Sequence, residues 1–289
     1  MQAMRANECL DIVAQLARDA SIELNVQDLT DLDASRSFLS AGKRMYISHL
    51  PKQRWDETVA ACAKVSDAGF DPIPHIPVRL LENEVVLDRL LDGVVRSGVK
   101  EVLLIAGDYA RAFGPYSQVS DVLRGDKLKQ HGLARVSFAG HPEGHPLIGP
   151  AEIRRAQLEK AALAASLDTT FVTQFFFEAG PFLNWASDMR AQGIRRARLI
   201  AGLAGPAAIG SLLKFAKRCG VGPSIRALVG KPGSFGKLLG QHGPESVMHE
   251  LGAAYERDSA TFNGLHFFCF GGYLQTCEWL KKVSLRGRT

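Results

Sequence analysis

The sequence predicts a single (β/α)8 barrel over residues 1–289, with a helix before the first strand and extra helices before the last strand. Three observations predict this fold class. Eight short runs are strand-like in apolar content, most stretches between them have amphipathic helical spacing, and several of those stretches end in Gly. A strand followed by a helix, repeated eight times, is the pattern of this barrel, and a chain of 289 residues is an ordinary length for it.

The elements follow one another regularly along the chain. Residues 1–20 place apolar and charged residues at helical spacing and predict the N-terminal helix. The stretches 55–69 and 82–98 predict typical connecting helices, and the long interval 206–263 predicts two or three inserted helices. The eight predicted strands are the apolar runs at 21–26, 44–50, 71–77, 101–108, 135–142, 170–177, 196–205 and 264–272.

Composition narrows the class of partner. The formal net charge is +5, but basic and acidic residues are interleaved, so we expect no nucleic-acid partner and favour anionic small molecules. No run is long enough to cross a membrane and the N-terminus lacks a secretory signal, so we expect a cytoplasmic protein without a membrane partner.

Cysteine and histidine spacing predicts no metal. Five cysteines are widely spaced and form no CxxC, which indicates a reducing compartment. The run HPEGH, 141–145, has two histidines four residues apart, but Pro142 and Gly144 argue against the helix that a zinc site of this spacing needs.

Polar residues gather where the predicted strands end, which is where barrels of this class carry their chemistry. Glu23 and Gln174 stand out because each lies inside an apolar run. A buried polar group that lacks hydrogen-bond partners costs about 1–3 kcal/mol, so we interpret both side chains as held for a ligand. The full set of rim residues is Glu23, Asn25, Ser48, His49, His75, Gly107, Asp108, His141, His145, Gln174, Gly271 and Gly272.

Six segments, taken in order, resemble the methylenetetrahydrofolate reductase family of flavin-dependent barrels. The most specific is TQFFFE at 173–178, which looks almost unchanged from the family signature. Each of the other five segments is a weak signal alone, but together, in the same order along the chain as in the family, they strengthen the resemblance. They are SIEL at 21–24, PHIP at 74–77, AGDYARAFGPYSQVSDVL at 106–123, HPEGHP at 141–146 and LHFF at 265–268.

The resemblance implies an activity. NADH or NADPH would pass a hydride to FAD and leave, and 5,10-methylenetetrahydrofolate would then take its place and be reduced to 5-methyltetrahydrofolate. That reaction belongs to one-carbon metabolism and methionine biosynthesis. Two alternatives stay open, namely the same chemistry in the oxidative direction within a demethylation pathway, and a non-catalytic folate- or flavin-binding partner. A homo-oligomer is also left open.

The resemblance also implies residue roles. Glu23 would be the general acid, and Asp108 would lie beside the flavin pyrimidine and the pterin. Gln174 would bind the pterin, Phe215 would pack on nicotinamide or on the aminobenzoyl ring of folate, and Ser211 would occupy the place of a second folate-binding residue. The implied FAD contacts are Ser48, His75, Gly107, Asp108, Ser120, His141, His145, Gln157 and Lys160.

The chain also departs from the family pattern. Ala106 stands where the family has an arginine, His141 where it has another aromatic residue, and Ser211 where it has a glutamine. Gln157 replaces an asparagine, and Lys160 aligns with the phosphate-binding lysine only after a shift of the gap. Arg154, Gly271 and Gly272 also differ from the residues expected there. We therefore expect a divergent member whose phosphate and folate-tail contacts differ from those of the family.

The implied acid role carries a condition on Glu23. A general acid has to hold a proton near neutral pH, and burial among apolar residues raises the pKa of a carboxyl group by penalising its charged form. We therefore expect burial to keep Glu23 protonated.

Overall fold

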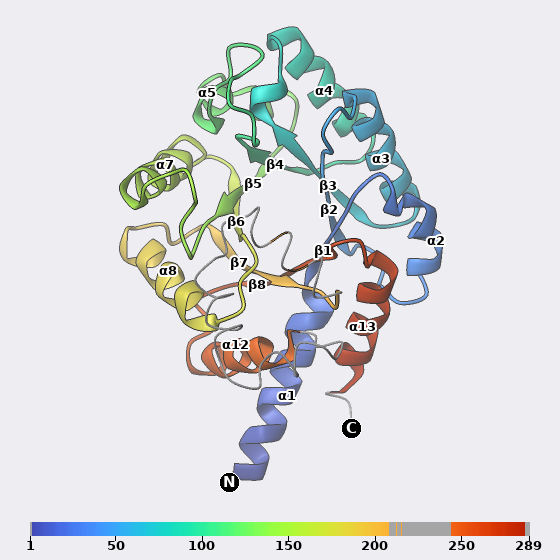
Figure 1. Ribbon diagram of the computed structural model, residues 1–289, viewed down its shortest axis with the longest axis vertical. Coiled ribbons are helices and arrows are strands. Elements are labelled where there is room, and N and C mark those ends of the chain that lie inside the picture. Colours follow the sequence, from blue (N-terminus) through green and yellow to red (C-terminus); the bar gives the residue numbers. More distant parts are fainter. Residues whose placement is uncertain (1, 208–211, 213–214, 216–243, 287–289) are drawn as a thin grey trace.

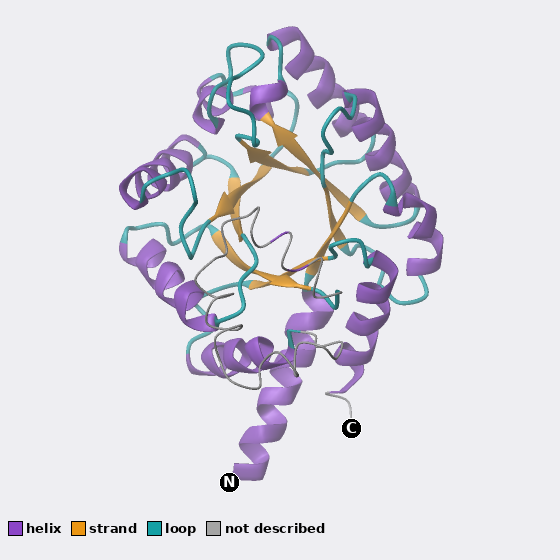
Figure 2. Ribbon diagram, viewed as in Figure 1, coloured by secondary structure: helices purple, strands orange, loops and turns teal. Residues whose placement is uncertain are grey.

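Eight parallel strands close into a barrel in which each strand pairs with the next and β8 returns to β1. The computed structural model describes residues 2–207, 212, 215 and 244–286. The strands form the ring at the centre of Figure 2, with helices outside it, and the predicted fold class is confirmed. The strands are β1 (Ser21–Leu24), β2 (Arg44–Ile47), β3 (Asp71–Pro77), β4 (Glu101–Ile105), β5 (Arg135–Gly140), β6 (Asp168–Thr173), β7 (Arg198–Ala204) and β8 (Gly264–Phe268).

Helices follow the strands around the outside of the barrel. The α-helices are α1 (Gln2–Asp19), α2 (Leu32–Ser35), α3 (Trp55–Asp67), α4 (Glu84–Arg96), α5 (Val119–Arg124), α6 (Lys127–Gln130), α7 (Pro150–Leu163), α8 (Ala179–Ala191), α12 (Glu245–Arg257) and α13 (Tyr273–Leu285). Two short 3-10 helices, η1 (Asp28–Asp31) and η2 (Val78–Leu80), complete the described elements. No helix among the described residues is long and apolar enough to cross a membrane.

Helix α1 precedes the barrel as predicted. It packs against α12 and α13, and Figure 1 shows its N-terminal part extending beyond the body of the molecule. Helix α12 is the described part of the predicted insertion before the last strand. Most of the rest of that insertion, from residue 208 to 243, lies outside the described residues.

The two-residue repeat of each strand sorts its side chains between the barrel interior and the helices. In β2, Met45 and Ile47 join the core beneath the helices, whereas Tyr46 between them belongs to a separate cluster. That cluster fills the middle of the barrel with five buried side chains, which we call the lumen layer. Its members are Tyr46, Ile73, Leu103, Val172 and Ile200.

Several strands end earlier than the apolar runs suggest. Strand β6 stops at Thr173, so Gln174 and the three phenylalanines after it follow the strand. Phe176 packs beneath α8, where its ring stacks on Phe182 with centroids 5.2 Å apart, whereas Phe175 joins a cluster at the strand ends. The apolar run outlasts the strand because the segment after β6 also buries its side chains.

Candidate active site

Glu23 lies at the C-terminal end of the barrel with partners from three other strands. The hydroxyl of Ser48, directly after β2, donates to Oε1 of Glu23 at 2.7 Å. Nε2 of His75 in β3 lies 3.7 Å from Oε2, and Nε2 of His266 in β8 lies 3.8 Å from the same oxygen. The Glu23 side chain is 22% exposed, so it opens to the mouth of the barrel while both imidazoles hold it from the sides.

The charge state of Glu23 is opposite to the expectation from burial. Burial alone raises the pKa of Glu23, but His266, His75 and the Ser48 hydroxyl together outweigh it and hold the pKa below its usual value. The pKa values of His75 and His266 are lowered, chiefly by burial. At neutral pH the cluster is therefore a carboxylate between two neutral imidazoles, and the expectation that burial protonates Glu23 is wrong.

His266 is a site residue that sequence reasoning missed. Its side chain is 1% exposed, and its Nδ1 lies 3.0 Å from the hydroxyl of Ser21, its partner in the β1–β8 register. This contact orients the ring so that Nε2 faces Glu23. The ring of Tyr46 lies edge-on beneath it, with centroids 4.8 Å apart. The alternation within the run LHFF was the available signal, since it places His266 and Glu23 on inward-facing positions of adjacent strands.

The segment after β4 carries Gly107 and Asp108 under tight constraints. Gly107 has φ +86°, and a Cβ added there would lie 3.0 Å from the Cβ of Pro77. Arg79 holds the rest of this segment, because its guanidinium donates to the carbonyl oxygens of Tyr109 and Ser117. Arg79 was not predicted from the sequence. Its guanidinium is bound to this backbone, and its own backbone N–H donates to the carbonyl oxygen of Ala106 at 3.3 Å.

The HPEGHP segment places two imidazoles beside the same mouth. The rings of His141 and His145 meet edge to face at 5.3 Å. Burial, then the charges of Lys160 and His145, lowers the pKa of His141 to about 4. Burial also lowers the pKa of His145, against the opposing effect of Asp108. Both rings are therefore neutral at neutral pH, and the effect of Asp108 on His145 places these two residues near each other.

Helix α7 contributes two predicted residues with different surroundings. Gln157 is 5% exposed, and its Nε2 has no hydrogen-bond partner among the described residues. The ammonium group of Lys160 lies 5.6 Å from the ring centre of Phe138 and 5.9 Å from that of Phe171. Burial lowers the pKa of Lys160 to about 8. Lys160 is thus placed over aromatic rings of β5 and β6.

Gln174 lies beside an aromatic wall. Its backbone N–H donates to the carbonyl of Gly140, and its side-chain Oε1 accepts from the N–H of Phe175 at 3.0 Å. The ring of Phe270 lies 4.8 Å from that of Phe175 and 4.7 Å from that of Phe215. The wall therefore connects the predicted pterin residue with the predicted stacking residue. Phe270 has φ +46°, an uncommon conformation for a residue with a side chain.

The structure thus brings most of the predicted residues to one end of the barrel. Glu23, Ser48 and His75 are in direct contact, and His141, His145 and Asp108 gather beside β4 and β5. Ser120 lies in the first turn of α5 and is buried. Ser211 falls outside the described residues.

Comparison with known families identifies the family of the chain. The family model described as methylenetetrahydrofolate reductase matches residues 52–225, more than half of the chain. The chain belongs to the methylenetetrahydrofolate reductase family. The match begins after Glu23 and Ser48 and ends before His266, so these three residues lie outside the matched range.

One sequence relative and one solved structure are similar to this chain. Methylenetetrahydrofolate reductase 2 of Saccharomyces cerevisiae is 26% identical over 119 residues, which are 38% of this chain and 19% of the yeast protein. The aligned part is thus under a fifth of that relative. A protein of Clostridium thermocellum that binds two copies of 5-methyl-5,6,7,8-tetrahydrofolic acid has a similar fold, with a TM-score of 0.64, 13% identity, and coverage of 94% of this chain and 96% of its own.

Proposed function

We propose that the protein reduces 5,10-methylenetetrahydrofolate to 5-methyltetrahydrofolate with NADH or NADPH, through bound FAD. The observation that carries this proposal is the position of Glu23. Ser48 fixes one of its oxygens, His75 and His266 flank the other, and the side chain opens to the barrel mouth in a chain that belongs to this reductase family.

Two features suit a bound flavin. The buried Nε2 atom of Gln157 in α7 lacks a hydrogen-bond partner among the described residues and could bond to a ligand. The absence of a side chain at Gly107 keeps the backbone accessible beside Pro77. When bound, FAD would supply hydride transfer, and the chain would supply position and electrostatics.

The phosphate end of FAD has weaker support. Ala106 offers no guanidinium, and the Lys160 ammonium lies over the rings of Phe138 and Phe171. Charge-assisted hydrogen bonds to phosphate contribute about 1.5–3 kcal/mol each. We therefore propose that the chain binds FAD more loosely than the family pattern implies.

The side chains of the mouth would divide the work on the folate. Glu23 would take up a proton from water at the barrel mouth, to which its side chain is partly exposed, and deliver it to the amine nitrogen that leaves when the five-membered ring opens. Asp108 would favour the cationic iminium that then accepts hydride. Gln174 would hold the pterin, since an amide matches a ligand that both donates and accepts hydrogen bonds. The folate bound by the Clostridium thermocellum protein supports this class of substrate.

The oxidative direction is a second candidate function. Oxidation of 5-methyltetrahydrofolate ends with ring closure, and the closing nitrogen then loses a proton to a base. The lowered pKa of Glu23 provides a carboxylate base at neutral pH, which favours this direction.

Anaerobic spectroscopy tests the proposal directly. Purified protein saturated with FAD should lose its flavin absorbance when NADH or NADPH is added, and regain it on addition of 5,10-methylenetetrahydrofolate. In the oxidative direction, 5-methyltetrahydrofolate should bleach the flavin and NAD(P)⁺ should restore it. Binding of FAD and folate without either bleaching would leave only the binding role. A lack of any flavin spectral change on FAD titration would overturn the flavoenzyme proposal.

Ala106→Arg should tighten FAD binding by about tenfold. The added guanidinium would stand at the position where the family carries one, and a single charge-assisted contact accounts for a change of that size. Fluorescence quenching of FAD measures the dissociation constant of both proteins. Ala110→Arg, four residues further along the same exposed segment, adds the same charge and is the control. Equal tightening in both variants would indicate general charge attraction, and no tightening would show that another group holds the phosphates.

A further inference from the structure

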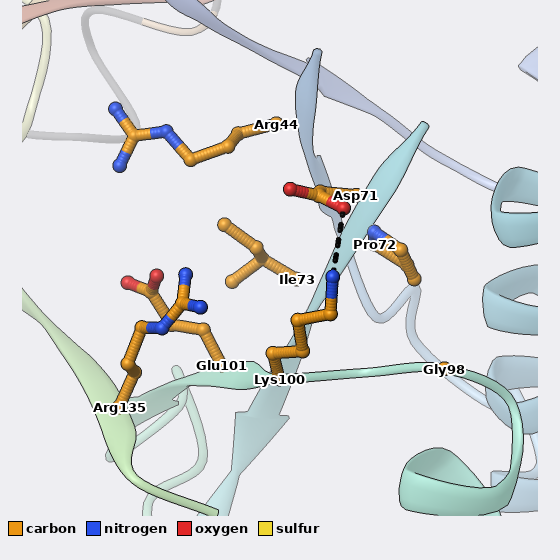
Figure 3. Close-up of a pocket in the computed structure, with 8 residues that line it drawn as sticks. All are labelled: Arg44, Asp71, Pro72, Ile73, Gly98, Lys100, Glu101 and Arg135. Atoms are coloured by element: carbon orange, nitrogen blue, oxygen red, sulfur yellow. Dashed lines mark ion pairs between the residues drawn. The ribbon is translucent and has the colours of Figure 1, made fainter. Parts of the chain in front are cut away.

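The opposite end of the barrel contains a small charged cavity that the proposed reaction does not use. It has a volume of about 10 Å³ and is formed by residues of β2, β3, β4 and β5 and of the turn before β4. Figure 3 shows five charged side chains around it. They are Arg44, Asp71, Lys100, Glu101 and Arg135.

The charges around this cavity do not cancel. Three cationic side chains face two carboxylates, which leaves one net positive charge on the lining. Lys100 and Asp71 form an ion pair at 3.7 Å, the dashed contact in Figure 3. The carboxylate of Glu101 is buried and accepts a hydrogen bond from Ser137, but within the described part of the chain it forms no ion pair with an arginine.

Arg44 supplies an unused hydrogen-bond donor at the same place. Its Nη1 is buried and has no hydrogen-bond partner among the described residues. Figure 3 shows its guanidinium on the same side of the cavity as the carboxylate of Glu101 and the guanidinium of Arg135. Arg198, the first residue of β7, adds a further positive charge nearby, because the charges of Arg44, Glu101 and Arg135 all act on it. A buried donor beside uncompensated positive charge is expensive to leave unpaired.

We propose that this cavity binds one small monovalent anion of about the size of chloride. A volume of about 10 Å³ has room for the centre of a single water-sized particle, so a monatomic anion fits it better than a sulfate or phosphate does. One negative charge would neutralise the excess on the lining and pair with the free Nη1 of Arg44. The anion would tie together the starts of β2 and β5, and it would stabilise the folded barrel by binding the native state alone.

Bromide, an anomalous scatterer that replaces chloride, tests the site itself. Crystals of the full chain grown in sodium bromide should show an anomalous peak between Arg44 and Arg135. A map without a peak there, at a resolution that shows bromide elsewhere, overturns the proposal.

Thermal unfolding tests the energetic consequence. At constant ionic strength, replacing sodium gluconate by sodium chloride should raise the Tm of the wild type by about 2 °C. Arg44→Met should remove this rise, whereas Arg96→Met, which removes an exposed charge of α4, should keep it. An equal rise in all three proteins would show that chloride acts elsewhere and would also overturn the proposal. If Arg44→Met does not fold, the bromide map of the wild type decides alone.

Discussion

Glu23→Gln should slow reoxidation of the reduced flavin by 5,10-methylenetetrahydrofolate by about 10²–10⁴, the usual loss when a general acid is removed. Reduction of the flavin by NADH or NADPH should stay within a few-fold of the wild type, since that step needs no proton from this side chain. Glutamine keeps the size of the side chain and its bond with Ser48, but it cannot release a proton. Anaerobic stopped flow follows each half-reaction through the flavin absorbance.

The control for Glu23→Gln is Asp28→Asn. Asp28 is another carboxylate of the segment after β1, and its side chain accepts from the backbone N–H of Asn25. Both half-reactions should survive in this variant. Equal loss of both half-reactions in Glu23→Gln would mean that Glu23 maintains the site, and an unchanged folate step would remove it from the mechanism.

The pH dependence of the wild type follows from the same cluster. Because the pKa of Glu23 is lowered, the protonated form grows as pH falls, so folate reduction should accelerate from pH 8 to pH 6. Oxidation of 5-methyltetrahydrofolate needs the carboxylate and should hold its rate over that range. A folate half-reaction that is independent of pH in the wild type would contradict proton delivery by Glu23.

Phe176→Ala should lower the free energy of unfolding by about 3–5 kcal/mol, the usual cost of truncating a buried aromatic side chain. Phe176 is 2% exposed and stacks on Phe182, which in turn contacts Phe262 and Trp185. Its loss would leave a cavity between the barrel and α8. Urea unfolding, followed by circular dichroism, measures the change.

Phe177→Ala is the matched control, one residue further along the same run. Phe177 is only partly buried and packs edge-on against Phe175 in the cluster at the strand ends. We therefore expect Phe177→Ala to lower the free energy of unfolding by about 1 kcal/mol. Comparison of the two variants shows how much stability comes from a phenylalanine of this run that packs in the core and how much from one that packs at the mouth. Equal losses would mean that the described packing of this run is wrong.

The sequence predicted the barrel because its regularity is local. Alternating strands and amphipathic helices can be recognised from periods of two and 3.6 residues, and the run 71–77 coincides with β3. The ends of other strands were harder to predict, because burial continues past the last ladder hydrogen bond. Phe175 is 1% exposed although it follows β6, so its apolar character reports packing and carries no information on the strand boundary.

Single residues of the candidate site stand out in the sequence, but the partners of Glu23 and its charge state do not. Glu23 and Gln174 stand out as polar residues in apolar runs. His266 becomes a partner of Glu23 only when closure of the barrel sets Ser21 against it, although more than 240 positions separate the two in sequence. The protonation of Glu23 depends on two opposing effects on its pKa, which burial raises and three neighbouring side chains lower. A sequence does not give the balance between them.

The lumen layer couples the two ends of the barrel, so neither end is an independent target for engineering. Tyr46 is its only polar member, and its hydroxyl bonds to Ser137 while its ring contacts His266 and His75. Ser137 in turn donates to Glu101 of the charged cavity, so contacts run through this layer from the base of the barrel to the residues around Glu23. Effects at sites that share partners generally do not add. A designer who changes the base of the scaffold would therefore have to test the opposite rim again before varying it for new ligands.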